Sequence, residues 1–498
     1  MGADDPTPPA RASAVMAEVM VVLGAALVLL DYVIKFLALG VLPSNKKPSS
    51  AMAWLILILI VPLAGFLVFL VLGRTSLGRG RLARQREADA AIRAATEVLP
   101  STTVSEPAYL PSMATLNYNL GALPLQGGNR IDLIPGYHDS IAAMTAEVAA
   151  SRSTVEVEFY ITAWDDVTGP FFEALVAATA RGVQVRLLVD HLGSRGIPGY
   201  DDFAKRLDAS DIEWRPMLPV RPLKGDFQRP DLRNHRKILV VDGAVAFMGS
   251  QNLIEPGYNK PKNHAAGRQW VELVARIEGP TVSALRAVFA KDWYTETHER
   301  LAEQIAASNP PIHEGGVAAQ VLPSGPGYVT ENNLRLFTAL IYSAQSRISL
   351  TSPYFVPDEP LLYAVTTAAR RGVEVELFVS EEGDQFMVYH AQCSYYQALL
   401  EAGVRIHLYP APAVLHSKHF SIDDDVAVIG SSNMDTRSFA LNSEVSMMLT
   451  GADIVARFRK VEDDYRALSR ELTLEEWRQR SFWQRYLDNT MRLTAALQ

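Results

Sequence analysis

Two copies of one motif bring together histidine, lysine and asparagine, residue types that suit chemistry on a phosphoryl group. Each copy spells His-x-Lys-x4-Asp and continues, at matching distance, into Gly-Ser-x-Asn. Two copies in register with the same tail are a far more specific signal than one copy. The residues are His235, Lys237, Asp242, Ser250 and Asn252 in the first copy, and His416, Lys418, Asp423, Ser431 and Asn433 in the second.

The side chains of the motif divide into reacting groups and charge-stabilising groups. Two histidines with pKa values near neutrality suit covalent catalysis by one and proton transfer by the other. Lysines and asparagines donate hydrogen bonds to phosphoryl oxygens as charge builds in the transition state, and the serines before the asparagines are counted with this phosphate-binding group. Because each copy holds one histidine, the repeat predicts that both halves share a single site.

The spacing within each copy indicates a β-strand. Side chains alternate between the two faces of a strand, so the histidine and lysine of each copy share one face. Asp242 and Asp423 end the apolar runs and are followed by return strands at 244–248 and 426–429. We count both aspartates with the catalytic motif but expect them mainly to shape turns.

An imidazole that acts as a nucleophile needs a carboxylate on its other nitrogen. Glu272 and Glu444 each follow a motif on another β-like run and are the candidates. The alternative is a surface carboxylate on an edge strand. We expect each carboxylate to serve the motif upstream of it, so that Glu272 matters more to His235 than Asp242 does.

A metal site is the competing use of histidine. The other histidines are scattered with no pair at ligand spacing, and the single cysteine, Cys393, offers no cluster. We therefore expect neither a metal nor another cofactor. His419 adjoins the second motif but points to the opposite face of its strand, which favours a structural role.

Helices and strands alternate around each motif. This alternation predicts an α/β fold class, with two similar layered lobes, and the repeat of roughly 190 residues has the size of a domain. The predicted elements are 141–150, 154–161, 170–180 and 183–189 in the first half, and 334–344, 347–352, 360–370 and 373–379 in the second.

Apolar segments near the N-terminus predict a membrane anchor of two helices. Residues 51–72 form an uncharged run long enough to cross a bilayer, and its proline and glycine are tolerated in membrane helices. Residues 19–41 reach that length only through Asp31 and Lys35, which stand four apart and could pair. A cleaved signal peptide is the alternative for this first span.

Arginines after the second apolar run predict the orientation. The positive-inside rule places them, and the chain that follows, in the cytoplasm. The same cluster could bind anionic headgroups, or it could be a solvated linker. Its members are Arg74, Arg79, Arg81, Arg84 and Arg86.

Changes in composition predict five parts. A Trp- and Arg-rich tail is either an amphipathic helix on the membrane surface or a packed C-terminal helix. The parts are a membrane anchor at 1–73, a basic linker at 74–115, a first lobe at 116–308, a second lobe at 309–470 and the tail at 471–498.

The overall charge bears on the class of partner. A formal net charge of -8 opposes wholesale binding of nucleic acid, for which a basic face is expected. The 48% hydrophobic content of 498 residues allows two or three full domain cores. One basic group leads into the first motif, and it contains Arg215, Arg221, Lys224, Arg229, Arg233, Arg236 and Lys237.

The doubled motif resembles the phospholipase D superfamily, and the whole chain resembles the bacterial cardiolipin synthases within it. The similarity covers nearly the entire chain, from the anchor to Arg492. The stretches that carry it are Asn45-Lys46-Lys47-Pro48-Ser49-Ser50, Glu158-Phe159-Tyr160-Ile161, Arg233-Asn234-His235-Arg236-Lys237, Ser352-Pro353-Tyr354-Phe355-Val356-Pro357-Asp358 and Ser432-Asn433-Met434-Asp435-Thr436-Arg437-Ser438-Phe439.

That resemblance implies a pseudo-twofold pair of lobes with one active site between them. It implies that a histidine attacks one phosphatidylglycerol, releases glycerol and forms a phosphatidyl-histidine, which a second phosphatidylglycerol resolves to cardiolipin. By similarity, His235 is the nucleophile and His416 the acid and base. The implied partners are phosphatidylglycerol and membrane lipids, and the implied location is the bacterial inner membrane with a cytoplasmic catalytic part.

Two features depart from that family's pattern. Glu272 stands where an aspartate is common, and the segment 255–269 is longer and more basic than expected. These departures concern which carboxylate serves the first site and which lipid is the acceptor.

Other functions use the same residues. A phospholipase D hydrolase or a transferase with another alcohol acceptor differs only in what reaches the phosphohistidine. A nuclease is opposed by the acidic balance and the anchor. A non-catalytic membrane scaffold is opposed by the presence of both histidines, both lysines and both asparagines. The sequence leaves oligomeric state and acyl-chain preference open.

Overall fold

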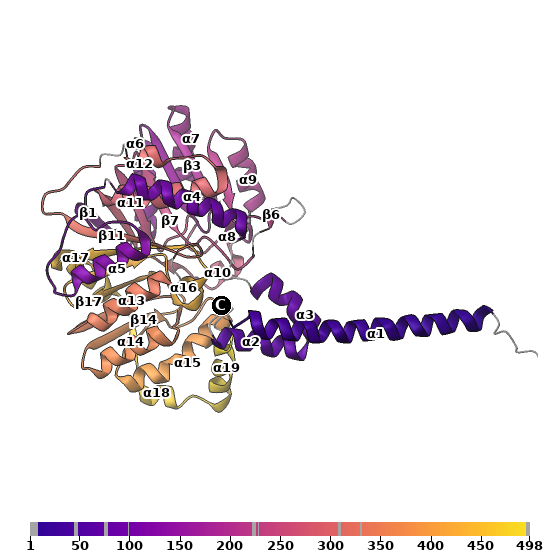
Figure 1. The fold of residues 1–498 in the computed structure, drawn as a ribbon. Coiled ribbons are helices and arrows are strands. Elements are labelled where there is room, and N and C mark those ends of the chain that lie inside the picture. Colours follow the sequence, from indigo (N-terminus) through magenta and orange to yellow (C-terminus); the bar gives the residue numbers. More distant parts are fainter. Residues whose placement is uncertain are drawn as a thin grey trace, which may run out of the picture. The chain divides into compact units, whose positions relative to one another are not determined.

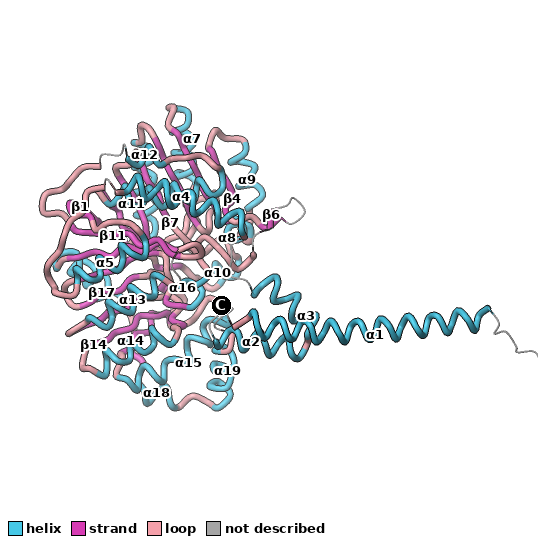
Figure 2. The backbone as a smooth tube through the Cα atoms, in the orientation of Figure 1, coloured by secondary structure: helices cyan, strands magenta, loops and turns pink. Residues whose placement is uncertain are grey.

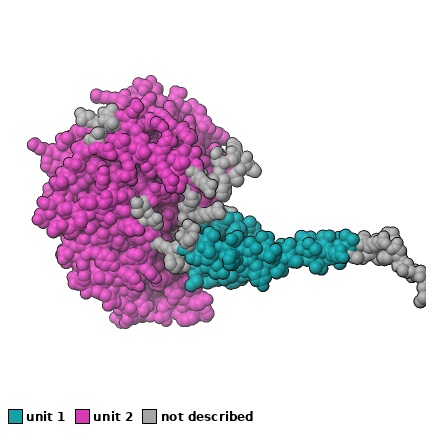
Figure 3. All heavy atoms as spheres, viewed as in Figure 1, with its two compact units in different colours: residues 1–76 teal, residues 77–498 magenta. Residues whose placement is uncertain are grey.

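The computed structural model divides the chain into two compact units, residues 1–76 and 77–498 (Figure 3). It describes residues 8–43, 48–73, 78–97, 99–221, 226–227, 229–306, 310–328 and 331–494. Three features of the sequence therefore lie outside the described residues: Lys46 and Lys47 of the anchor, Arg74 of the arginine cluster, and Lys224 of the basic group.

Among the described residues of the first unit, one helix is long and apolar enough to cross a membrane. Within α1 (Pro8–Val41), residues Val15–Val41 meet that criterion by length and composition. The predicted pairing inside this segment is confirmed, because Lys35 Nζ lies 2.9 Å from Asp31 Oδ2.

The second apolar run, predicted at 51–72 as one membrane-crossing segment, is divided into three helical elements. It forms α2 (Pro48–Ile60), α3 (Pro62–Val68) and the five-residue π-helix η1 (Phe69–Gly73). Pro62 starts α3 because it lacks the N–H that would continue α2. At Gly65 a β-carbon would lie 2.9 Å from Leu57 O, a close backbone approach that fits glycine alone. The run is therefore bent, and its crossing of a membrane stays a prediction.

The second unit is built on one 15-stranded sheet. The sheet runs continuously through both lobes (Figure 1). Its halves meet where β1 pairs with β11, and the strand order outward from this junction matches in the two lobes. The first lobe reads β1 (Gln126–Ile134), β10 (Val274–Glu278), β8 (Val245–Gly249), β7 (Lys237–Val241), β2 (Thr154–Phe159), β3 (Gln184–Asp190) and β4 (Glu213–Met217). The second reads β11 (Val317–Ser324), β20 (Glu444–Thr450), β18 (Val426–Gly430), β17 (His419–Ile422), β12 (Arg347–Thr351), β14 (Glu374–Ser380), β15 (Arg405–Tyr409) and β21 (Arg470–Leu472).

Short strands lie outside this sheet and pair among themselves. They are β5 (Val220–Arg221) with β6 (Asp226–Phe227), β9 (Trp270–Val271) with β16 (Val414–Leu415), and β13 (Phe355–Val356) with β19 (Met434–Asp435). The pair β9 and β16 joins the two lobes, because its strands come from different halves of the chain.

Helices cover both faces of the sheet (Figure 2), which confirms the predicted layered α/β fold. On one face, α11 (Thr281–Thr297) and α17 (Ala452–Leu468) pack in one core shared by both lobes. The other face carries α6 (Tyr137–Ala150) and α7 (Gly169–Ala180) in the first lobe, and α13 (Asn332–Ser343), α14 (Glu359–Arg370) and α15 (Phe386–Ala402) in the second. Shorter helices within the two lobes are α8 (His191–Arg195), α9 (Tyr200–Asp208), α10 (Pro261–Ala265), α12 (Ala302–Ala306) and α16 (Thr436–Ala440).

Strand β7 shows the alternation predicted for the first motif. Ile238 and Val240 pack in the core that contains α11, whereas Leu239 and Val241 pack in the core that contains α6 and α7. Both faces of the strand are therefore buried, which holds the motif's histidine and lysine at a fixed position.

Two helices before the first lobe belong to the second unit. They are α4 (Arg79–Thr96), which lies within the predicted linker at 74–115, and α5 (Leu110–Gly121), which begins in that range and continues past its end. Helix α4 docks on α11, where Arg81 pairs with Glu296 and Lys291 Nζ lies 2.6 Å from Asp89 Oδ1. Arg81 is thus engaged with protein rather than with a lipid headgroup.

The C-terminal tail packs on the second lobe and also exposes an aromatic face. It contains α18 (Leu474–Arg478) and α19 (Phe482–Arg492). Asp488 of α19 is buried and accepts a hydrogen bond from Arg480 at 2.5 Å, while His390 Nδ1 of α15 lies 2.7 Å from it. The opposite face exposes Phe482, Trp483 and Tyr486.

Candidate active site

The two motif histidines line one cavity between the lobes. His235 precedes β7, and His416 lies between β16 and β17. Both line a cavity of about 300 Å³. Their backbones are anchored across the lobes, because His235 N donates to Ser443 O at 2.8 Å and His416 N donates to Val271 O at 2.7 Å. The expected single site of two half-motifs is thus present geometrically.

The carboxylate beside each histidine comes from the other lobe. His235 Nδ1 lies 3.0 Å from Glu444 Oε2, and His416 Nδ1 lies 2.7 Å from Glu272 Oε1. The predicted match of Glu272 with His235 is therefore wrong. The physical reason is that β9, just before Glu272, leaves the first lobe's sheet and pairs with β16, just before His416.

The charge states follow from deep burial. Burial lowers the pKa of His235 and of His416 to about 4, against the pull of the adjacent glutamates. Burial alone would raise the pKa of Glu272 and Glu444, but their histidine partners hold both below the usual value. Both imidazoles are thus neutral and both carboxylates ionised at neutral pH, and with each Nδ1 engaged, Nε2 is the nitrogen free to react.

The two motif lysines are buried and, unlike the histidines, do not line the cavity. Lys237 Nζ donates to His235 O and Lys418 Nζ to His416 O, each at 2.6 Å. Burial lowers the pKa of Lys237 to about 7 and that of Lys418 to about 8, and the charge of Lys418 lowers the pKa of Lys237 further. An anion bound between them would raise both pKa values again.

The Gly-Ser-x-Asn tails divide into two different roles. Asn252 and Asn433 line the cavity, as the phosphate-binding prediction requires. The serines do not line it: Ser431 Oγ donates to Glu444 Oε2 at 2.5 Å, and a hydrogen bond from Ser250 helps to lower the pKa of Glu272. The structure thus places the serine hydroxyls against the carboxylates rather than toward a phosphate.

The motif aspartates stand at the far end of their strands. Asp242 and Asp423 have positive φ values of 53° and 47° in the turns between strands. The Asp242 carboxylate accepts from Arg152 N at 2.9 Å and Ser153 N at 2.7 Å, and Asp423 makes the same bonds to Gln345 N and Ser346 N. The expected turn-forming role is confirmed, and neither side chain lines the cavity.

Several residues that line the cavity were not singled out as site residues from the sequence. The ring of Tyr160 lies edge-on to His235 at 4.8 Å between centroids, and Tyr354 lies likewise 6.3 Å from His416. Arg437, Asp435 and Asp384 also line it. The two tyrosines follow β2 and β12, which occupy matching places in the lobes, so the internal repeat is the signal that could have found them.

His419 packs behind the second motif. It is buried against Phe458 of α17, and its Nε2 lies 3.3 Å from Thr351 Oγ1. This arrangement confirms the structural role expected for it. Within the described ranges, no group of three or more His, Cys, Asp and Glu side chains is arranged to hold a metal ion.

Comparison with known proteins places the chain among lipid enzymes. The family described as cardiolipin synthase, PLD-like domain, matches residues 144–293 and 337–464, and the phospholipase D-nuclease N-terminal family matches residues 29–74. Cardiolipin synthase A of Proteus mirabilis is 34% identical over 455 residues, covering 90% of this chain and 93% of that protein. Cardiolipin synthase A of Pectobacterium carotovorum is 33% identical over 468 residues, with the same coverage.

A solved structure supports the fold alone. Phosphatidylserine synthase of Haemophilus influenzae superposes with a TM-score of 0.58 at 13% identity, covering 77% of this chain and 99% of that one. The two-lobed architecture is therefore shared with at least one lipid enzyme whose sequence has diverged widely.

Proposed function

The chain belongs to the cardiolipin synthase family of phospholipase D-like proteins, and we propose that it joins two phosphatidylglycerol molecules into cardiolipin and free glycerol. The observation that carries the proposal is the crossed pair of His–Glu contacts, which supplies two oriented imidazoles to one cavity. One imidazole can hold the phosphatidyl group covalently while the other moves the proton.

In the first half-reaction, Nε2 of His235 attacks the phosphorus of one phosphatidylglycerol. The P–N bond forms as the P–O bond to glycerol breaks, and the departing oxygen takes a proton from His416. The bound phosphodiester brings a negative charge into the cavity, which raises the depressed pKa of His416 and lets it carry that proton. Glu272 and Glu444 stabilise whichever imidazole is cationic.

The second half-reaction reverses these roles with a different alcohol. A hydroxyl of the second phosphatidylglycerol gives its proton to His416 and attacks phosphorus, and the P–N bond to His235 breaks. Lys237, Lys418, Asn252 and Asn433 stabilise the charge on the phosphoryl oxygens in both transition states. All atoms balance, and neither a metal nor a nucleotide enters these steps.

The N-terminal part of the chain supports a membrane substrate. The apolar α1 and the match of residues 29–74 to a phospholipase D-type N-terminal family are consistent with membrane association. We infer a location in the bacterial inner membrane with the catalytic unit in the cytoplasm, because arginines follow η1 in the sequence and the positive-inside rule places them on the cytoplasmic side. No role for nucleic acid is proposed.

The test is the purified full-length chain in phosphatidylglycerol vesicles, without divalent metal and without CDP-diacylglycerol. One cardiolipin and one glycerol should form for every two phosphatidylglycerols consumed. Phosphatidic acid as the sole lipid product would make the protein a hydrolase instead.

Histidine variants assign the roles within the same test. We expect His235→Ala to form no phosphoenzyme, whereas His416→Ala should accumulate it from a donor with a good leaving group such as p-nitrophenol. The opposite pattern would exchange the two roles.

A further inference from the structure

One wall of the active-site cavity carries a carboxylate that the reaction above does not use. Asp384, in the loop between β14 and α15, lines the same cavity as His235 and His416. Both oxygens of its carboxylate accept from the Tyr354 hydroxyl at 3.0 Å, and Gln385 Nε2 donates to that hydroxyl at 2.8 Å. Because the Tyr354 ring lies edge-on to His416, Asp384 stands on the side of the cavity where His416 acts.

The charge of Asp384 opposes a phosphate-binding role. A carboxylate repels a phosphodiester, and the repulsion is strong in a cavity shielded from water. Arg437 lines the cavity near Tyr160 and offers the phosphate a positive charge, and the proposed function gives the same role to Lys237 and Lys418, which are buried and do not themselves line it. Asp384 therefore faces a part of the substrate that donates hydrogen bonds and carries no negative charge.

The carboxylate also has acceptor capacity to spare. An ionised carboxylate can accept about four hydrogen bonds. Among the residues that the structure describes, Tyr354 is the one side chain that donates to Asp384. Lys260 and Arg268 lie near enough to lower its pKa, which burial raises, but within the same described ranges neither forms an ion pair with it.

We propose that Asp384 forms a subsite for a vicinal diol, the hydrogen-bonding part of a glycerol headgroup. This inference rests on the proposed function, because it names the group that selects the acceptor. The primary hydroxyl of the acceptor gives its proton to His416 and attacks phosphorus, while the adjacent secondary hydroxyl donates to Asp384. The glycerol that leaves in the first half-reaction occupies the same place.

Such a subsite explains how an alcohol competes with water for the phosphohistidine. A buried group built to bind a substrate hydroxyl discriminates strongly against an acceptor that lacks it. A hydrogen bond to a charged acceptor corresponds to a preference of roughly ten- to a hundredfold. We therefore expect 1,2-propanediol to react faster than 1-propanol by about that factor, although both present one primary hydroxyl.

The experiment is an internal competition. The full-length chain in mixed phosphatidylglycerol micelles receives equal concentrations of 1,2-propanediol, 1-propanol and ethanolamine, and the phosphatidyl products are quantified by mass spectrometry. All acceptors resolve the same intermediate, so the product ratio reports only the acceptor step and is independent of how much of a variant is folded. The variant is Asp384→Asn, which keeps the shape and an oxygen for Tyr354.

The matched control is Glu382→Gln, two residues away in the same loop. Its carboxylate is 65% exposed and does not line the cavity. Asp384→Asn should reduce the ratio of diol to propanol products by about tenfold or more, and Glu382→Gln should leave it at the value of the unaltered chain.

Two outcomes would overturn the inference. One is a diol preference that survives in Asp384→Asn. The other is a preference for ethanolamine that Asp384→Asn removes, because the carboxylate would then recognise an ammonium group. Both are distinct from failure of the proposed function, in which the unaltered chain forms neither cardiolipin nor any phosphatidyl alcohol.

Discussion

His235 and His416 each lie against a carboxylate from the opposite lobe, and this exchange decides which glutamate serves which step. Glu444 contacts His235 and Glu272 contacts His416, at 3.0 and 2.7 Å. A carboxylate of this kind acts only through its own imidazole, by fixing the tautomer and stabilising the cation. The pairing can therefore be tested as an energetic coupling.

We predict that the effects of Glu272→Gln and Glu444→Gln depend on the histidine that remains. Each single variant should lower kcat by about 10²- to 10⁴-fold, by analogy with loss of the triad carboxylate in serine proteases. In a His416→Ala background, Glu272→Gln should not slow the single-turnover burst from a p-nitrophenyl phosphatidyl donor any further, because its partner is already absent. Glu444→Gln should slow that burst strongly. If adding Glu272→Gln in the His416→Ala background slows the burst further, Glu272 supports His235 instead.

The lysines predict an alkaline limit to activity. In the free enzyme Lys237 and Lys418 lose their protons near pH 7 and 8, so the kcat/KM profile should fall as the pH rises through that range. A bound phosphodiester raises both pKa values, so the fall in kcat should lie at higher pH than the fall in kcat/KM. Initial rates measured between pH 6 and 10 at several substrate concentrations give the fall in kcat and the fall in kcat/KM. A kcat/KM that stays level to pH 9 would contradict the assignment.

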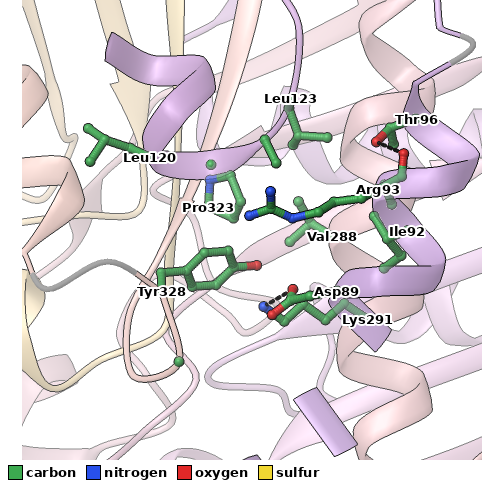
Figure 4. Close-up of a pocket in the computed structure, with 14 residues that line it drawn as sticks. Asp89, Ile92, Arg93, Thr96, Leu120, Leu123, Val288, Lys291, Pro323 and Tyr328 are labelled. Carbon is green, nitrogen blue, oxygen red and sulfur yellow. Dashed lines mark hydrogen bonds and ion pairs between the residues drawn. The ribbon is translucent and has the colours of Figure 1, made fainter. Parts of the chain in front are cut away.

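At the scale of elements, helix α4 joins the catalytic unit through buried charge. Figure 4 shows Lys291 of α11 pointing toward Asp89 of α4, with the ring of Tyr328 alongside. Lys291 is buried, and its Nζ lies 3.6 Å from the centroid of that ring. The next residue of α11, Asp292, forms a second ion pair with Arg236 of the first motif. One helix thus contacts both the segment after the membrane anchor and the residue beside His235.

We predict that Asp89→Ala destabilises the protein because it leaves the Lys291 ammonium buried without its counter-charge. The free energy of unfolding should fall by about 1–3 kcal/mol, since the pair is only partly shielded on the Asp89 side. Adding Lys291→Met should recover most of the loss. Thermal denaturation of the full chain in detergent measures both variants.

The control for this helix is Glu87→Ala. Glu87 of α4 pairs at 2.5 Å with Arg300, which follows α11 in the chain, and both side chains are more than half exposed. Because solvent screens exposed ion pairs, its removal should leave the thermal stability close to that of the unaltered chain. If Asp89→Ala combined with Lys291→Met is no more stable than Asp89→Ala alone, the ion pair between Lys291 and Asp89 is not what α4 contributes to stability.

At the scale of the whole molecule, two opposed halves of one chain make one site, and apolar segments link it to lipid. If α1 alone crosses the membrane, the N-terminus and the catalytic unit lie on opposite sides of it. If the second apolar segment, α2 with α3, crosses as well, they lie on the same side.

We predict two crossings with the catalytic unit in the cytoplasm. The single native cysteine, Cys393, is buried and should stay silent toward a membrane-impermeant maleimide. Cysteines introduced by Gly2→Cys and Asp201→Cys should both be labelled only after cells are opened. Labelling of the Gly2 position in intact cells, with Asp201 protected, would mean that α1 alone crosses.

The sequence by itself determined the chemistry and the class of fold. The doubled motif, in register with its Gly-Ser-x-Asn tails, identified both histidines, both lysines and both asparagines, and strand alternation predicted the buried β7 correctly. The aspartates were predictable as turn formers because their neighbours are turn residues and their strands end there. These are local properties, set by residue type and by spacing along the chain.

Only the tertiary structure decided which groups meet. Glu272 follows His235 by 37 residues and Glu444 follows His416 by 28, and neither spacing separates a partner in the same lobe from one in the other. The choice is made by β9, which pairs with β16 across the lobes and carries Glu272 to His416. The same holds for the serine hydroxyls that turn toward carboxylates, for Asp384 in the cavity wall, and for α4 on α11. Contacts between segments far apart in the chain depend on how the two lobes pack, and that packing is a property of the whole fold.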